Sequence, residues 1–310
     1  MNKTPLIMDV DTGTDDAIAI ITALMSSDVL EILAFTTVAG NVGVELTNKN
    51  TLNIVDFLGF DIPVSIGADK PLKRELHIAN SHGVSGLGDV KLPQSNKKFY
   101  HKDAVDTIYE HAQLMNGELE ILAVGPLTNV ALALLRYPDI KNLIKRITIM
   151  GGALIGGNMT PCAEFNIYVD PDAAKIVFES GIPLVMVGLD VTLKSKLPSR
   201  VFNVVKNLDN QSSILASKIF GYMIKRRKKL GFDPPNVHDL VALCTLLIPN
   251  AFTFKDYSIA IETDGELTRG MTVVDFNDVL KLEPNVKAAV DIDIEMFWNF
   301  IIDKFVRDNN

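Results

Sequence analysis

The chain has 310 residues, of which 47% are hydrophobic and 22% charged, and its formal net charge is −8 at neutral pH. This length suits one large α/β domain or two smaller ones, and the apolar content supports a sizeable core. The acidic balance argues against a nucleic-acid partner, because binding of nucleic acid usually needs a basic surface.

The sequence also predicts a cytoplasmic protein. Cys162 and Cys244 lack the spacing of a metal site, and two cysteines do not suggest a disulfide framework. The first residues lack the basic region, apolar stretch and cleavage site of a signal peptide. Because no apolar run reaches about 18 uncharged residues, no membrane span or membrane partner is expected.

Strand-like and helix-like segments alternate along most of the chain. In chain order, the expected elements are a strand at 5–10, a helix at 15–27, a strand at 30–40, a helix at 44–59, a strand at 62–68, a helix at 103–115, a strand at 119–125, a helix at 127–138, a strand at 146–152, a helix at 171–181 and a strand at 183–191.

The last third of the chain is less regular. Its expected elements are a long helical stretch at 199–230, an apolar helix at 238–249, strands at 257–263, 271–276 and 286–293, and a terminal helix at 295–306. Two segments, 69–101 and 153–170, lack clear periodicity and are interpreted as loops. A loop as long as 69–101 in a compact domain is usually functional or disordered.

Repeated strand–helix units predict an α/β fold with a mostly parallel central sheet flanked by helices, in a Rossmann-like arrangement. The chain shows no linker rich in Pro, Ser or Gly and no internal repeat, so residues 1–310 are expected to form a single domain. In such sheets, sites lie at the carboxyl ends of the strands. Asp11, Asn41 and Val124 each follow an expected strand, so they are expected to lie near one another.

Residues 9–16, DVDTGTDD, place four aspartates between two apolar segments. Asp9 and Asp11 share one face if the strand continues that far, and Asp15 and Asp16 would open the next helix, where the helix dipole favours negative charge. Helix capping would explain one aspartate. Three converging carboxylates repel one another unless they are protonated or bridged by a cation. We therefore predict a metal site, and ligands that are all oxygen favour Ca²⁺ or Mg²⁺ over Zn²⁺.

Further polar residues lie in the loops that follow expected strands or open a helix. Asn, Glu and Asp side chains are suited to binding sugar hydroxyls, and His can protonate a leaving group. The candidates are Asn41, Asn80, His82, Asn129, Asn158, Glu164, Asn166, His238 and Asp239. Each has a simpler alternative, such as a surface position or a hydrogen-bonded structural role for His82, or an N-cap role for Asp239.

The motifs DVDTGTDD, VAGN, HG, GPLTN, MGG, AEFN and HD follow one another in this order over nearly the whole chain. In this arrangement the sequence resembles the inosine-uridine preferring nucleoside hydrolase family. The resemblance implies bound Ca²⁺ and hydrolysis of the N-glycosidic bond of ribonucleosides, which are small-molecule substrates. We also expect a homo-oligomer, either a dimer or a tetramer.

The resemblance also implies roles for individual residues. The calcium ligands would be Asp11, Asp15, Asp16, Asp239 and the main-chain oxygen of Val124. The residues around the bound ribose would be Asp15, Asn41, Met150, Asn158, Glu164, Asn166 and Asp239. His82 and His238 would face the base. In this interpretation Asp11 is the general base that activates water, and His238, with His82 nearby, donates a proton to the departing base.

The sequence departs from the family pattern on the base side. Gly88 stands where relatives often carry an aspartate, Arg226 where they carry Tyr or Gln, and Leu230 at another common aromatic position. We predict that Arg226 contacts the base and favours oxygen-rich bases, such as uracil or hypoxanthine, over adenine. The alternative is that the basic run from Lys225 to Lys229 is a solvated helix face.

Two other functions fit parts of the sequence. DVDTGT matches the D-x-D-x-T pattern of haloacid-dehalogenase-type phosphatases, in which Asp9 would be the nucleophile. That class also needs a later Lys and a further acidic pair, and it leaves Asp15 and Asp16 unexplained. The second alternative is a protein that binds calcium and ribose without turnover.

Overall fold

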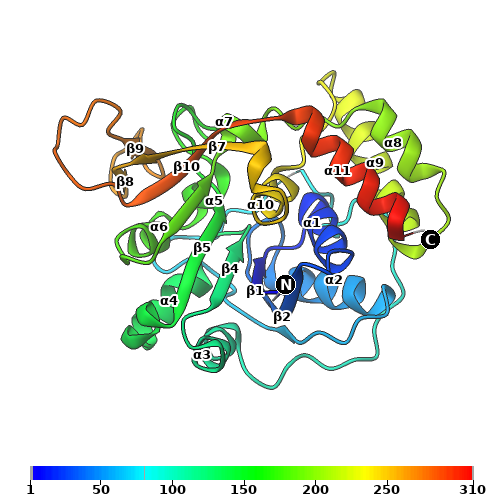
Figure 1. The fold of residues 1–310 in the computed structure, drawn as a ribbon, viewed down its shortest axis with the longest axis horizontal. Coiled ribbons are helices and arrows are strands. Elements are labelled where there is room, and N and C mark those ends of the chain that lie inside the picture. The colour runs from blue at the N-terminus through cyan, green and yellow to red at the C-terminus, as the bar shows by residue number, and fades with distance from the viewer. Residues whose placement is uncertain (1–2, 80, 309–310) are drawn as a thin grey trace.

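The computed structural model describes residues 3–79 and 81–308, so Asn80 lies outside the described residues. An eight-stranded sheet runs through the molecule in the order β3-β2-β1-β4-β5-β6-β10-β7 (Figure 1). Neighbouring strands are parallel except for β7, which pairs antiparallel with β10. The predicted α/β fold with a mostly parallel sheet is confirmed. That one sheet supports the single domain expected over 1–310, which stays a prediction.

The strands of the sheet are β1 (Thr4–Val10), β2 (Leu30–Thr37), β3 (Val64–Ser65), β4 (Leu119–Ala123), β5 (Ile144–Met150), β6 (Leu184–Val187), β7 (Phe252–Tyr257) and β10 (Val286–Ile292). A separate antiparallel pair is formed by β8 (Ile259–Ile261) and β9 (Thr272–Val274).

The helices are α1 (Thr14–Leu24), α2 (Val44–Phe57), α3 (Ala104–Met115), α4 (Thr128–Arg136), α5 (Phe165–Val169), α6 (Pro171–Phe178), α7 (Leu189–Thr192), α8 (Ser199–Lys206), α9 (Gln211–Lys229), α10 (His238–Leu247) and α11 (Ile294–Asp308). Two short 3₁₀ helices are Pro138–Asn142 and Pro249–Ala251.

Helices cover both faces of the sheet (Figure 1). In β1 the side chains alternate: Leu6, Met8 and Val10 join the core formed with α1, α9, α10 and α11, whereas Ile7 joins the core formed with α3, α4 and α6. This alternation follows from the two-residue period of a strand. A strand buried on both faces reads as a continuous apolar run, which is why residues 5–10 show no polar alternation.

The chain reverses its direction across the sheet next to β1. From β1 it proceeds to β2 and β3 on one side, and β4, β5 and β6 extend on the other side. In open α/β sheets, ligands bind outside the carboxyl ends of the strands at such a switch point. Asp11, Asn41 and Val124 follow β1, β2 and β4, so the fold brings these predicted residues to that edge.

Several expected elements differ from the structure, and β7 was not expected, because the strand predicted at 257–263 corresponds to β8. The helical stretch predicted at 199–230 is two helices, because the Asn210 side chain accepts a hydrogen bond from Ser213 N at 2.7 Å and starts α9 anew. The strand predicted at 183–191 ends at Val187, and α7 follows Gly188. The loop predicted at 153–170 contains the short helix α5, which Glu164 caps.

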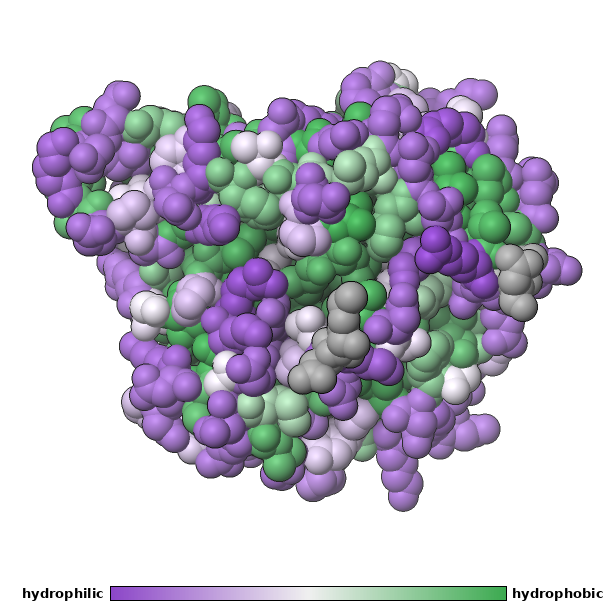
Figure 2. All heavy atoms as spheres, viewed as in Figure 1, coloured by the Kyte–Doolittle hydropathy of each residue, from purple (hydrophilic) through white to green (hydrophobic). Residues whose placement is uncertain are grey.

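No helix among the described residues is long and apolar enough to cross a membrane. On the face drawn in Figure 2, hydrophilic side chains dominate the rim and apolar side chains show mainly over the middle of the molecule.

Candidate active site

The turn between β1 and α1 fixes the first aspartates. Asp16 Oδ1 accepts from Asp11 N at 3.1 Å, and Asp16 Oδ2 accepts from Gly13 N at 2.9 Å. Asp11 Oδ2 in turn accepts from Asn41 N at 2.7 Å. The capping alternative is therefore correct for Asp16, but it does not account for the other carboxylates. Asp11 and Asp16 are fully buried, while Asp15 borders a cavity.

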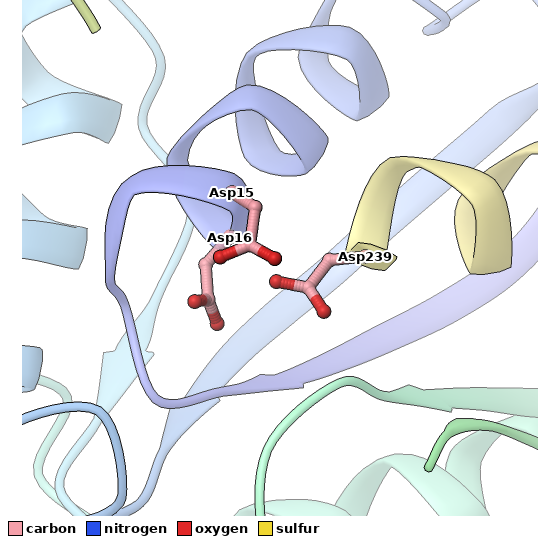
Figure 3. A group of neighbouring side chains, drawn as sticks. All are labelled: Asp15, Asp16 and Asp239. Atoms are coloured by element: carbon pink, nitrogen blue, oxygen red, sulfur yellow. The ribbon is translucent and has the colours of Figure 1, made fainter. Parts of the chain in front are cut away.

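Asp239 joins this group from the first turn of α10. Carboxylate oxygens of Asp15, Asp16 and Asp239 lie within 4.8 Å of one another, and the side chains converge from the starts of two helices (Figure 3). Burial, together with neighbouring carboxylates, raises the pKa of Asp16 and of Asp239. Burial also raises the pKa of Asp15, although His238 opposes the shift. Such a group is stable as charged carboxylates only with a compensating cation.

The residues present fit a hard cation. Asp11 Oδ1 is buried and has no hydrogen-bond partner in the described part of the chain. Burial and the charge of Asp16 raise the pKa of Asp11 well above its usual value. An orphaned carboxylate oxygen beside three clustered carboxylates gives an all-oxygen donor set, which suits Ca²⁺ or Mg²⁺. The group is therefore a candidate metal site, as the sequence predicts.

The cavity beside these carboxylates has a volume of about 440 Å³. On the side nearest the acidic cluster, Asp15, Asn41, Val124 and Asp239 line it. Asn41 Nδ2 already donates to Asp16 Oδ2 at 2.9 Å. A volume of this size accommodates a small organic ligand.

Residues at the end of β5 and in the segment that follows it also line the cavity. Asn166 Nδ2 donates to Val124 O at 2.7 Å and to Met150 O at 3.0 Å. Glu164 accepts from Gly152 N at 3.0 Å and also caps α5. Burial raises the pKa of Glu164 to about 7. Exposed Asn158 lies at the cavity edge and accepts from the main chain of the AEFN motif.

The two predicted histidines also line the cavity. His82 Nδ1 accepts from Thr14 N at 3.0 Å, so the ring proton sits on Nε2. Burial lowers the pKa of His82 to about 4, and the surface alternative for this residue is therefore wrong. His238 Nδ1 lies 2.9 Å from Thr192 Oγ1 of α7, and burial lowers its pKa as well. The lowered pKa values favour neutral rings near neutral pH, and His82 can donate a hydrogen bond from Nε2.

The basic run of α9 does not lie wholly in solvent. Arg226 and Arg227 are partly buried and line the cavity, whereas Lys225, Lys228 and Lys229 are exposed. The solvated-face interpretation therefore holds for the three lysines and is wrong for the two arginines.

Sequence reasoning missed several lining residues. They are Thr14, Ile78, Ala79, Ser81, Met159, Phe165, Met223, Arg227, Pro235 and Asn236. Most are apolar, and an apolar residue in the sequence has the pattern of a core residue. Asn236 carries no such explanation, although its Oδ1 is buried without a partner among the described residues.

Gly88 is explained by Tyr222 of α9. Gly88 and Gly83 both have positive φ values, +67° and +74°. A Cβ at Gly88 would overlap the ring of Tyr222, and one at Gly83 would lie 2.9 Å from its hydroxyl oxygen. Tyr222 therefore fills the space that a side chain at position 88 would need, and it packs on the turn that follows His82.

Asp9 does not fit the phosphatase alternative. Its Oδ1 accepts from Thr36 Oγ1 at 2.6 Å and from Asn129 Nδ2 at 2.7 Å. Burial raises its pKa to about 7, and it does not line the cavity. Asp9 and Asn129 thus support the sheet edge beneath the site and offer no exposed nucleophile.

Comparisons with known proteins agree with this geometry. Residues 6–299 match the model of the family described as inosine-uridine preferring nucleoside hydrolase. The pyrimidine-specific ribonucleoside hydrolase RihA of Salmonella typhimurium is 41% identical over 304 residues, which cover 97% of each chain. A solved purine-preferring ribonucleoside hydrolase from Gardnerella vaginalis has a TM-score of 0.92 and 32% identity, covering 98% of this chain and 99% of that one.

A solved plant nucleoside hydrolase is similar as well, with a TM-score of 0.90 and 31% identity over 98% of this chain and 99% of its own. Family match, identity and fold agree over nearly the full length. The chain therefore belongs to the inosine-uridine preferring nucleoside hydrolase family and is a ribonucleoside hydrolase.

Proposed function

We propose that this hydrolase depends on calcium and that its cavity holds the ribose at the acidic end and the base at the end lined by His82, His238 and Arg226. The observation that carries the proposal is the group of buried carboxylates beside a cavity that is also lined by His82, His238, Arg226 and Arg227. Oxygen ligands and a buried site suit Ca²⁺, which accepts irregular sets of carboxylate and carbonyl oxygens.

In the proposed site, the ion is held by the carboxylates of Asp11, Asp15, Asp16 and Asp239 and the main-chain oxygen of Val124. Calcium supplies positive charge that offsets the buried carboxylates and makes a nearby water more acidic. Asp11 has the free oxygen needed to take that proton, because its Oδ1 is unpaired among the described residues.

The chain's own groups then carry the reaction. The water oxygen bonds to the anomeric carbon, the C–N bond breaks, and its electron pair remains on the base nitrogen. Asp15, Asn41, Asn158, Glu164 and Asn166, with Met150 beside them, hold the ribose in an attack geometry. His238 and His82 stabilise the departing base by hydrogen bonds from their neutral rings, and the base leaves as an anion that takes its proton from solvent.

For the base, we propose a preference for carbonyl-rich rings such as uracil or hypoxanthine over adenine. Arg226 supports this, because guanidinium groups donate hydrogen bonds and cannot accept them. The names of the similar proteins do not agree on the class of base: the Salmonella enzyme is called pyrimidine-specific and the Gardnerella enzyme purine-preferring.

A panel of nucleosides tests the proposed function. We expect release of reducing sugar from uridine and inosine, and much slower release from adenosine. Absence of sugar from every nucleoside in the presence of calcium would favour the alternative of binding without turnover. Equal rates on uridine, inosine and adenosine would remove the proposed base preference.

Removal of one ribose hydroxyl should cost much of the activity. We expect kcat/KM for 2′-deoxyuridine to fall at least about 100-fold below that for uridine, because buried polar groups built for a hydroxyl are left unpaired. Steady-state kinetics on the two substrates measure the ratio. Comparable values would contradict the ribose roles given to Asp15, Asn41, Glu164 and Asn166.

We also propose a role in nucleoside salvage, since the products are ribose and a reusable base. A cytoplasmic location is supported by Cys162 and Cys244, which are both free thiols in the structure. A homo-oligomer stays a prediction, supported by exposed apolar side chains after β9, such as Val279 and Leu280. Sedimentation of a monomer at micromolar concentration would contradict it.

A further inference from the structure

Two arginines stand side by side at the base end of the cavity. Arg226 and Arg227 are consecutive in the last turn of α9, and both line the cavity. One arginine would supply enough donors for the carbonyl oxygens of a neutral base. A second guanidinium in a partly buried site adds a positive charge that a neutral ligand does not offset.

The second arginine is held in place by the chain. Arg227 Nε donates to Asp233 O at 3.0 Å, and its guanidinium lies 4.7 Å from the centre of the Phe232 ring. These contacts fix a side chain that is otherwise flexible, so less entropy is lost when a ligand binds it.

Nearby acidic groups are partly committed to other cations. Asp233 pairs with Lys196 at 2.5 Å, and Asp89 lies 3.9 Å from Lys225. The charge of Arg227 also contributes, after that of Lys196, to the lowered pKa of Asp233. Burial lowers the pKa of both imidazoles; Asp16 raises and Arg226 lowers the pKa of His82, and Asp15 raises and Arg227 lowers that of His238. The imidazoles therefore lie within the electrostatic reach of both the carboxylates and the arginines that line the cavity.

We propose that Arg226 and Arg227, which both line the cavity, select nucleosides whose base carries a carboxylate on the edge away from the ribose. This inference rests on the proposed placement of ribose at the acidic end. Charge-assisted hydrogen bonds from a planar guanidinium to an anion are roughly twice as strong as neutral ones, and two guanidinium groups match one anionic edge.

The test compares matched substrates within one enzyme. 5-Carboxyuridine and 5-carboxamidouridine have nearly the same shape and differ in charge. We expect the wild-type KM to be at least about tenfold lower for the carboxylate than for the amide. In Arg226→Gln/Arg227→Gln that ratio should fall to near one. Because each ratio is taken within one protein, a partial loss of folding cancels.

A matched control removes the same charge from the same helix outside the cavity. Lys228→Gln/Lys229→Gln should keep the wild-type ratio, since both lysines are exposed. If the KM ratio fell equally in this control, the preference for the anionic substrate would come from the overall positive charge of the helix surface, and the proposal would be overturned. A wild-type KM ratio near one for the carboxylate and the amide would overturn it as well.

Uridine 5′-monophosphate distinguishes a second source of negative charge. If the arginine variants lose hydrolysis of this nucleotide while the carboxyuridine ratio is unchanged, the pair serves a 5′-phosphate and the inference is wrong. Failure of the proposed function gives a different result, because then no sugar is released from uridine itself.

Discussion

Asp11→Asn should lower kcat by about 10³-fold while the protein remains folded, because general base catalysis contributes roughly 10²- to 10⁴-fold and a ligand of the proposed ion is lost as well. Asn keeps the shape and can still accept from Asn41 N, which Asp11 Oδ2 does at 2.7 Å. It cannot take a proton. Steady-state kinetics on uridine at saturating calcium measure the effect.

The same variant provides its own control for folding. Asp11 is fully buried beside Asp16, and burial and that charge raise its pKa. Replacement by a neutral amide removes one buried charge, so the melting temperature of the metal-free variant should equal or exceed that of the metal-free wild type. Activity within tenfold of wild type would show that another group takes the proton.

Removal of calcium should abolish turnover and destabilise the protein. An ion present at about 100 times its dissociation constant contributes roughly 2.7 kcal/mol, which corresponds to a fall of about 5 °C in melting temperature when it is withdrawn. Chelation followed by differential scanning calorimetry measures this shift, and added Ca²⁺ should restore both activity and melting temperature. Full activity after exhaustive chelation would contradict the metal dependence.

The pH dependence of the metal-free protein has a definite sign. Burial raises the pKa of Asp11, Asp16 and Asp239 above their unfolded values, so the folded state binds more protons between the two pKa values. Stability of the metal-free protein should therefore rise as the pH falls from neutral toward the unfolded carboxyl pKa of about 4, and saturating calcium should flatten this slope. If the metal-free protein instead lost stability on the same acidification, groups other than this aspartate cluster would determine the pH dependence of unfolding.

Most of the fold was predictable because strands buried on both faces leave long apolar runs, as in β1 and β4. The break between α8 and α9 was missed, since the signal is the cap at Asn210, and a lone Asn in a polar stretch is common. The end of β6 was missed for a similar reason: the apolar pattern continues through Leu189 and Val191, which are buried in a helix.

The acidic end of the site was predictable because its charge is concentrated in eight consecutive residues, whereas the base end was not. Asp239 lies beside the aspartates of the DVDTGTDD segment because α10 packs against α1. The order of the family motifs implied this proximity, whereas the spacing of the residues in the sequence did not. Arg227 was missed because its inward position depends on the turn at Phe232 and Asp233.

The packing of Tyr222 on Gly88 constrains how this enzyme could diverge. A side chain at position 88 would overlap the Tyr222 ring, and the +67° φ adds strain for most residues. An aspartate at this position would fit only if a smaller residue first replaced Tyr222. The reverse order of substitutions would displace the turn that follows His82. The two positions are therefore epistatic, and the order of substitutions decides which evolutionary routes remain open.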